Sequence, residues 1–224
     1  MNTASILGIS CMASYLLGAV PFGFIFAKAK GVDIRTVGSK NIGATNVFRS
    51  VSKALGITTF ICDVLKGFVA TFLFPIIAVE FLAGVGGHLP DNAANAGQIL
   101  PVLCACFAVA GHNWPVYLKF KGGKGVATSA GALLGIAPLP LGIGLAVWIV
   151  VFALSRYVSL ASITAALTIP AAGWILVFVH SPLIPRGYLI PTLLTILGLA
   201  SVWRHKANIK RLLEGTENRF VSKK

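Results

Sequence analysis

Acidic residues are scarce in this chain, since only six of its 224 residues are Asp or Glu. Sites that hold several catalytic metal ions are built mainly from carboxylates, so the shortage argues against a multi-metal enzyme. The aspartates Asp33, Asp63 and Asp91 are isolated from one another, which excludes a paired-aspartate motif. The chemistry, if any, must therefore come from other residue types.

Cysteine is also rare. Cys11, Cys62, Cys104 and Cys106 all lie in or beside apolar runs. None forms a Cys-x-x-Cys pair, and no histidine lies at zinc-finger spacing from them. We interpret the four cysteines as small buried apolar residues and predict no metal site.

Apolar residues, by contrast, are abundant. They make up 56% of the chain, charged residues make up 11%, and the mean hydropathy is +0.85. A soluble domain cannot bury that much apolar surface, so we expect a multi-pass membrane protein with about six to eight spans. No stretch remains for a separate soluble domain, and residues 1–224 are expected to form one transmembrane domain.

The placement of the spans can be tested against the basic residues. Apolar runs cover residues 4–27, 64–84, 97–118, 124–138, 141–155, 159–180 and 188–203. No basic region precedes the first run, which predicts an uncleaved span with its N-terminus outside. With seven spans, every Lys and Arg except Arg186 then falls in the cytoplasm, while residues 85–98 form a small polar outer loop. The fold class is therefore expected to be all-α, with about seven transmembrane helices and a cytoplasmic C-terminus.

The net charge of +13 has two explanations in such a protein. Membrane topology is the first, because basic residues flank the apolar runs, and an anionic substrate is the second. Nucleic acid, the usual partner of a basic soluble protein, is not expected.

The first inner segment, Gly38–Arg49, concentrates hydroxyls, amides and cations within twelve residues. These groups can donate hydrogen bonds to an anion, and Arg49 can grip a phosphate through two N–H groups. An ordinary polar turn between two helices is the alternative. The pattern is not a Walker loop, because Gly-Lys-Ser/Thr is absent.

A second segment, Gly111–Thr128, contains the sequence Lys-Gly-Gly-Lys-Gly around Lys124. Glycine lets backbone N–H groups approach a phosphate, and a helix expected after Gly125 would add its free N–H groups. Close helix packing is the alternative role for these glycines. His112 is as well explained by a buried structural role as by a site role.

Three further polar groups lie at helix ends on the predicted inner side. Asp63 and Lys66 are spaced i, i+3, which favours an ion pair over a role in orienting Arg49 or a substrate. The serines between the fifth and sixth spans could cap a helix or contact phosphate. The basic tail after the last span could be a surface anchor, but His205 and Asn208 would face the same way, and its acidic residues suggest specific pairing. Together, the five groups predict one concave, cationic site on the inner side of the membrane, which we call the cationic cup.

These motifs exclude some enzymes and resemble another. No histidine has an aspartate five residues later, so the His-x4-Asp signature of the common glycerolipid acyltransferases is absent. The segments Gly38–Arg49, Gly111–Thr128, Ser155–Ser162 and His205–Glu217 instead resemble, in order, the motifs of the bacterial PlsY family of membrane glycerol-3-phosphate acyltransferases. One departure is Lys40, where that family usually has Gly.

The resemblance implies acyl transfer from a fatty acyl phosphate to the 1-hydroxyl of sn-glycerol 3-phosphate at the bacterial inner membrane. It implies no cofactor, and an upstream enzyme that supplies the acyl phosphate. The residues that would bind acyl phosphate are Thr45, Gly122, Gly123, Ser155, Ser159 and Ser162. Those that would bind glycerol 3-phosphate are Ser39, Arg49, Lys124, His205 and Asn208. Supporting roles fall to Asn41, Asn46, Asp63, Lys66, His112 and Glu217.

The resemblance gives no nucleophile and suggests that a substrate phosphate accepts the proton, although His205 is the best protein candidate for a base. Two other functions use similar residues. A carrier for an organic phosphate would share the cationic cup but would need polar groups through the membrane midplane, in which the apolar runs are poor. A lipid-binding scaffold would need the basic tail but not the Ser, Thr, Asn and Gly loops.

Overall fold

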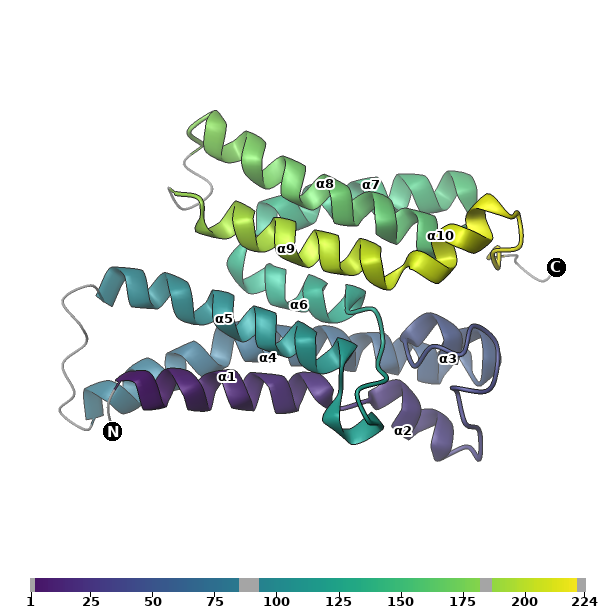
Figure 1. The fold of residues 1–224 in the computed structure, drawn as a ribbon, viewed down its shortest axis with the longest axis horizontal. Coiled ribbons are helices and arrows are strands. Elements are labelled where there is room, and N and C mark those ends of the chain that lie inside the picture. Colours follow the sequence, from purple (N-terminus) through teal and green to yellow (C-terminus); the bar gives the residue numbers. More distant parts are fainter. Residues whose placement is uncertain (1–2, 85–92, 182–186, 221–224) are drawn as a thin grey trace. The chain divides into compact units, whose positions relative to one another are not determined.

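The computed structural model describes residues 3–84, 93–181 and 187–220, and these residues form helices and connecting loops. The chain divides into two compact units, Met1–Ile136 and Ala137–Lys224 (Figure 1). Five of the described helical segments are long and apolar enough to cross a bilayer. The expected all-helical membrane architecture is therefore confirmed.

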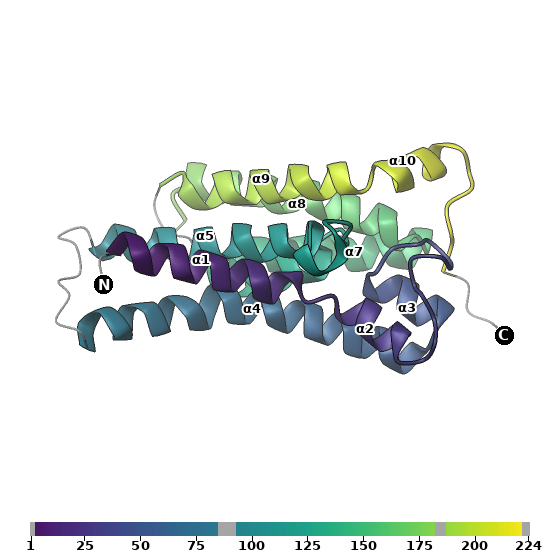
Figure 2. The same ribbon diagram turned by 60° about the horizontal axis from the view of Figure 1, so that its bottom comes forward.

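The first unit is a bundle of long helices with short ones at one end. It contains α1 (Thr3–Ala19), α2 (Phe22–Lys28), α3 (Ala44–Ser50), α4 (Lys53–Gly84), α5 (Ala93–Asn113), the 3-10 helix η1 (Val116–Leu118) and α6 (Val126–Ile136). α1 packs against α4 and α5, and α6 packs mainly against α4. Both α2 and α3 lie at the end of the bundle where α1 ends (Figures 1 and 2).

The first apolar run is not one continuous helix. α1 ends at Ala19 and α2 begins at Phe22, so the break falls at Val20 and Pro21. Pro21 has no N–H to donate and its ring obstructs the preceding turn, which interrupts the helical ladder. Ala4–Lys28 as a whole is still long and apolar enough to span a bilayer.

Two other apolar runs differ in length from their helices. α4 has 32 residues, about 48 Å at a rise of about 1.5 Å per residue, and it starts well before the predicted residue 64. α6 has only 11 residues, about 16 Å, which is shorter than a hydrocarbon core of about 30 Å. α9 (Leu189–Arg204) is likewise a shorter apolar helix. Of the predicted outer loop, residues 85–92 lie outside the described residues, and residues 93–98 are the first turns of α5.

Small residues let helices of the first unit approach closely. A Cβ added at Gly18 of α1 would collide with the Ala108 carbonyl of α5, and one at Gly131 of α6 would collide with the Val64 carbonyl of α4. Close backbone approach of this kind is typical of helix pairs in membranes. The four cysteines are free. Cys11 and Cys104 are buried as predicted, whereas Cys62 and Cys106 are only partly buried.

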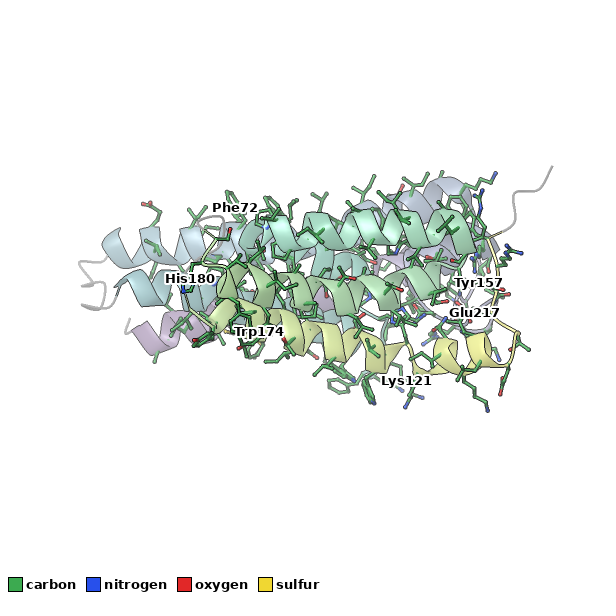
Figure 3. All side chains as sticks on the ribbon, turned by 90° about the horizontal axis from the view of Figure 1, so that it is seen from above. Phe72, Lys121, Tyr157, Trp174, His180 and Glu217 are labelled. Atoms are coloured by element: carbon green, nitrogen blue, oxygen red, sulfur yellow. The ribbon has the colours of Figure 1, made fainter. Side chains whose placement is uncertain are left out.

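The second unit contains α7 (Pro138–Ser155), α8 (Val158–Phe178), α9 and α10 (Lys206–Leu213). α8 packs against both α7 and α9, and α10 contacts α8 and α9. α7 begins at Pro138, where proline fits because the first N–H groups of a helix need no helical acceptor. Tyr157 and Glu217 lie at one end of this unit, and Trp174 and His180 lie at the other (Figure 3).

Candidate active site

Asn46 organises the segment Gly38–Arg49. Its side chain is buried, and its Oδ1 accepts hydrogen bonds from the Ser39 backbone N–H (3.0 Å) and the Ser50 hydroxyl (3.2 Å). Its amide nitrogen shares two hydrogens among three carbonyl oxygens, those of Ile34 (3.2 Å), Val37 (3.1 Å) and Asn41 (2.9 Å). One side chain therefore holds the path of the whole loop, and Asn46 supports the site by shaping this loop.

The rest of this segment leaves polar side chains at the surface. Ser39 and Arg49 are exposed, and Thr45 is partly buried in the first turn of α3. Asn41 accepts the Gly43 N–H at 2.8 Å and closes a local turn. Lys40 has a φ of 57°, in the left-handed region that favours glycine. The local backbone at position 40 is thus one that glycine would adopt without strain.

The Lys-Gly-Gly-Lys-Gly loop is folded onto the end of α5. The Gly123 N–H donates to the His112 carbonyl at 3.0 Å, and a Cβ at Gly123 would collide with His112 Nε2. Gly125 has a φ of +78° and α6 begins at Val126, as predicted. Lys124 is partly buried. The glycines therefore let the loop lie directly against the His112 side chain.

The predicted ion pair is present but lies inside the protein. Asp63 Oδ1 and Lys66 Nζ are 2.8 Å apart, and their side chains are 4% and 1% exposed. Lys66 also donates to the Val20 carbonyl at 2.9 Å. Both residues are well inside α4, so the expected position of this pair at a helix end is wrong. His112 is buried, and its Nδ1 lies 3.6 Å from the same Asp63 oxygen.

In the second unit, Glu217 joins residues that the sequence assigned to different substrates. Its Oε1 accepts from the Ser159 hydroxyl (2.8 Å) and from Asn208 Nδ2 (2.7 Å), and its Oε2 accepts from Arg211 Nε (2.7 Å). Burial alone would raise the pKa of the Glu217 carboxyl. The hydrogen bonds from Asn208, Ser159 and Arg211 outweigh that cost and hold the pKa below its usual value. The expected pairing of acids in the basic tail is thus confirmed.

His205 lies between α9 and α10 and is 2% exposed. Its Nδ1 lies 2.8 Å from the Ser201 carbonyl oxygen. A carbonyl only accepts hydrogen bonds, so Nδ1 must carry a proton, and Nε2 is the nitrogen left for other partners.

The other two serines each donate to a carbonyl one turn earlier in their own helix, and Ser162 also accepts from Trp148 Nε1 of α7 at 3.1 Å. Ser155 Oγ donates to the Val151 carbonyl at 2.6 Å, and Ser162 Oγ donates to the Val158 carbonyl at 2.8 Å. α8 begins after Tyr157 without a side-chain cap, so the capping role considered for these serines is wrong. Among the described residues, no group of three His, Cys, Asp or Glu side chains could hold a metal ion.

Comparison with known proteins identifies the family. A family model described as glycerol-3-phosphate acyltransferase matches residues 8–215. The chain belongs to the glycerol-3-phosphate acyltransferase family. A relative of that name from Methylobacillus flagellatus is 43% identical over 225 residues, covering 100% of each chain. Membership in this family establishes an acyltransferase of phospholipid synthesis and decides against the carrier.

Two crystal structures of PlsY, an integral membrane glycerol 3-phosphate acyltransferase, are similar to this chain. The glycerol 3-phosphate form is 37% identical with a TM-score of 0.78, and 96% of each chain is covered. The lysophosphatidic acid form is 36% identical with a TM-score of 0.75, covering 96% of this chain and 95% of that one. The resemblance to the PlsY family is therefore confirmed, and the chain is a multi-pass integral membrane protein.

Residues after Glu217 in this acyltransferase were missed by sequence reasoning. The Phe220 N–H donates to the Arg156 carbonyl at 2.7 Å, and the Phe220 ring packs edge-on against Phe152 at a centroid distance of 5.6 Å. Arg219 Nε donates to the Ser155 carbonyl at 3.3 Å. These contacts fold residues 217–220 back onto the turn between α7 and α8. Backbone acceptors leave no mark in a sequence, so no pattern could have revealed them.

Proposed function

We propose that this acyltransferase takes its acyl group from a fatty acyl phosphate and transfers it to the 1-hydroxyl of sn-glycerol 3-phosphate. The hydroxyl oxygen attacks the acyl carbonyl carbon, an ester C–O bond forms, and the anhydride C–O bond breaks. The products are lysophosphatidic acid and inorganic phosphate. A mixed anhydride already carries a good leaving group, so neither a cofactor nor a covalent enzyme intermediate is needed, and the protein contributes positioning and charge stabilisation.

The proposed residue roles follow the motifs. Thr45, Gly122 and the serines Ser155, Ser159 and Ser162 serve the acyl-phosphate group. Ser39, Arg49, Lys124, His205 and Asn208 serve glycerol 3-phosphate. Support comes from the donor-rich Gly38–Arg49 loop and from the partly buried Lys124, which directly follows two glycines in the sequence. The Gly123 N–H already donates to His112, so we assign Gly123 to the shape of the loop.

The observation that carries the mechanism is the hydrogen bond from His205 Nδ1 to the Ser201 carbonyl. If Nε2 donates to the phosphate of glycerol 3-phosphate, the imidazole holds a proton on each nitrogen and has no lone pair with which to act as a base. We therefore propose that a substrate phosphate accepts the proton of the attacking hydroxyl. His205 then binds substrate rather than removing the proton.

The test uses purified protein in detergent or lipid mesophase with palmitoyl phosphate and glycerol 3-phosphate. Release of inorganic phosphate in step with lysophosphatidic acid is expected, with no product from palmitoyl-CoA. His205→Gln keeps a side-chain N–H donor and should raise KM for glycerol 3-phosphate while leaving a measurable kcat. Loss of turnover in His205→Gln, with binding of glycerol 3-phosphate intact, would make His205 the base and refute the substrate-assisted route.

We further propose the topology expected from the basic residues. Residues 1–224 act as one domain with about seven spans, an outside N-terminus and cytoplasmic basic loops, in the inner membrane of a bacterium, where another enzyme supplies acyl phosphate. Single cysteines placed at Lys40 and Gly187 in a cysteine-free background distinguish the two sides. A membrane-impermeant maleimide applied to intact cells should label position 187 and not position 40.

A further inference from the structure

A buried ion pair in the first unit has no evident stabilising purpose. Asp63 and Lys66 are almost fully removed from solvent and face each other at 2.8 Å. Desolvation of two charges often cancels their attraction, and apolar replacements of buried pairs are frequently neutral or stabilising. Stability alone therefore does not account for this ion pair.

Asp63 faces a second partner from a different helix. Its Oδ1, the oxygen that pairs with Lys66, also lies 3.6 Å from His112 Nδ1. The His112 side chain is 5% exposed and comes from the last turn of α5. Lys66 is fixed in turn by the Val20 carbonyl at 2.9 Å. The carboxylate of Asp63 therefore sits between an anchored cation and the imidazole.

His112 packs against the Lys-Gly-Gly-Lys-Gly loop with both its backbone carbonyl and its ring. Its carbonyl accepts the Gly123 N–H at 3.0 Å, and its ring occupies the space that a Cβ of Gly123 would need. A Cβ at Gly122 would collide with the same His112 carbonyl. A rotation of the imidazole must therefore displace the backbone immediately before Lys124.

We propose that Asp63 is a positioning residue that acts through His112. It fixes the imidazole, the imidazole fixes Gly122 and Gly123, and these glycines set the position of Lys124 toward glycerol 3-phosphate. Lys66, 2.8 Å away, holds the carboxylate of Asp63 in place. The inference rests on the proposed role of Lys124 in binding glycerol 3-phosphate.

A double-mutant cycle tests this chain of contacts from Asp63 through His112 and the glycines to Lys124, which we call the relay. KM and kcat for glycerol 3-phosphate are measured with palmitoyl phosphate for Asp63→Asn, His112→Phe and the double variant. Displacement of a binding group by about 1 Å can cost up to about a hundredfold, so we expect each single change to raise KM about tenfold or more. Because both act through one imidazole, the double variant should be no worse than the poorer single variant. Effects on KM that multiply in the double variant, or an unchanged KM in Asp63→Asn, overturn the relay.

A second variant separates positioning from folding. Asp63→Asn leaves Lys66 buried without its counter-charge, whereas Asp63→Asn combined with Lys66→Met removes both charges. We expect this pair of changes to restore the melting temperature but not KM. Restoration of both would show that Asp63 only neutralises Lys66, and would overturn the proposal. Asp33→Asn is the matched control, because Asp33 pairs with the exposed Arg35 at 2.7 Å and should leave KM unchanged.

Lys124→Met, measured in the same series, distinguishes the two levels of inference. An unchanged KM in Lys124→Met refutes the proposed role of Lys124, whatever Asp63 does. A raised KM in Lys124→Met with an unchanged KM in Asp63→Asn refutes the relay alone. A raised KM in both, with the non-additive cycle, supports the relay.

Discussion

Replacement of Asn46 by alanine should destabilise the protein more than replacement of Asn41 by alanine in the same loop. The side chain contributes two hydrogens and accepts two hydrogen bonds, and its partners are backbone groups of residues 34–41 and the Ser50 hydroxyl. At about 1 kcal/mol for each net hydrogen bond, Asn46→Ala should cost about 4 kcal/mol. For a chain of this size, that corresponds to a fall in melting temperature on the order of 10 °C.

Two companion variants sharpen the test. Asn41→Ala removes one side-chain hydrogen bond in the same loop, the one to the Gly43 N–H, and should cost about 1 kcal/mol. Asn46→Asp keeps the size of the side chain and the acceptor but turns an oxygen toward three carbonyl oxygens. Asn46→Asp should therefore be at least as unstable as Asn46→Ala. The Ser39 amide should also lose its protection from hydrogen exchange in Asn46→Ala.

A thiol-reactive fluorescent dye can follow thermal unfolding, because Cys11 and Cys104 are buried in the folded protein. The order of melting temperatures should be wild type, then Asn41→Ala, then both Asn46 variants. If Asn46→Ala melts within about 2 °C of Asn41→Ala, or if Asn46→Asp matches the wild type, Asn46 does not hold the loop as described.

Three other predictions use the same preparations. Lys40→Gly should melt higher than Lys40→Ala by the equivalent of about 1 kcal/mol, because only glycine adopts a φ of 57° without strain; equal melting temperatures would contradict this. Gly123→Ala should raise KM for glycerol 3-phosphate at least tenfold because its Cβ collides with His112, whereas Gly142→Ala, with open space around it, should match the wild type. The folded-state pKa of Glu217 lies below its usual value of 4.5, so its stabilisation is present above that pH and is lost as the pH falls through the folded-state pKa. Melting temperatures measured from pH 3 to 7 should therefore fall more steeply in acid for the wild type than for Glu217→Gln.

Helices were predictable from sequence where apolar runs were long, and their ends were predictable only where a local signal existed. Gly125 marked the start of α6 correctly, and the i, i+3 spacing of Asp63 and Lys66 correctly predicted their pairing. The start of α4 was missed because its first turns mix polar and apolar residues, as the segment from Lys53 shows. An apolar pattern detects only the part of a helix that needs an apolar environment.

The segments that form the candidate site were predictable from the sequence, but the hydrogen bonds between them were not. Acids in the basic tail indicated pairing, yet the serine that donates to Glu217 lies 58 residues earlier in the chain. In the sequence, Asn46 is one hydrogen-bond donor among several. Its side chain donates to three backbone carbonyls of its loop, and backbone carbonyls carry no sequence signal. Long-range contacts and backbone acceptors are decided by packing, which one sequence does not display.

The broken first span and the buried lysine also constrain how this chain can change in evolution. Pro21 interrupts the helix and frees the Val20 carbonyl, and Lys66, 46 positions away, uses that carbonyl as an acceptor. A substitution that repaired the helix would deprive the ammonium of this acceptor. Loss of Lys66 would leave the carbonyl with only the 3.2 Å bond from the Phe22 N–H. We therefore expect relatives that lack the proline to lack the lysine as well, so that the two positions vary together across the family.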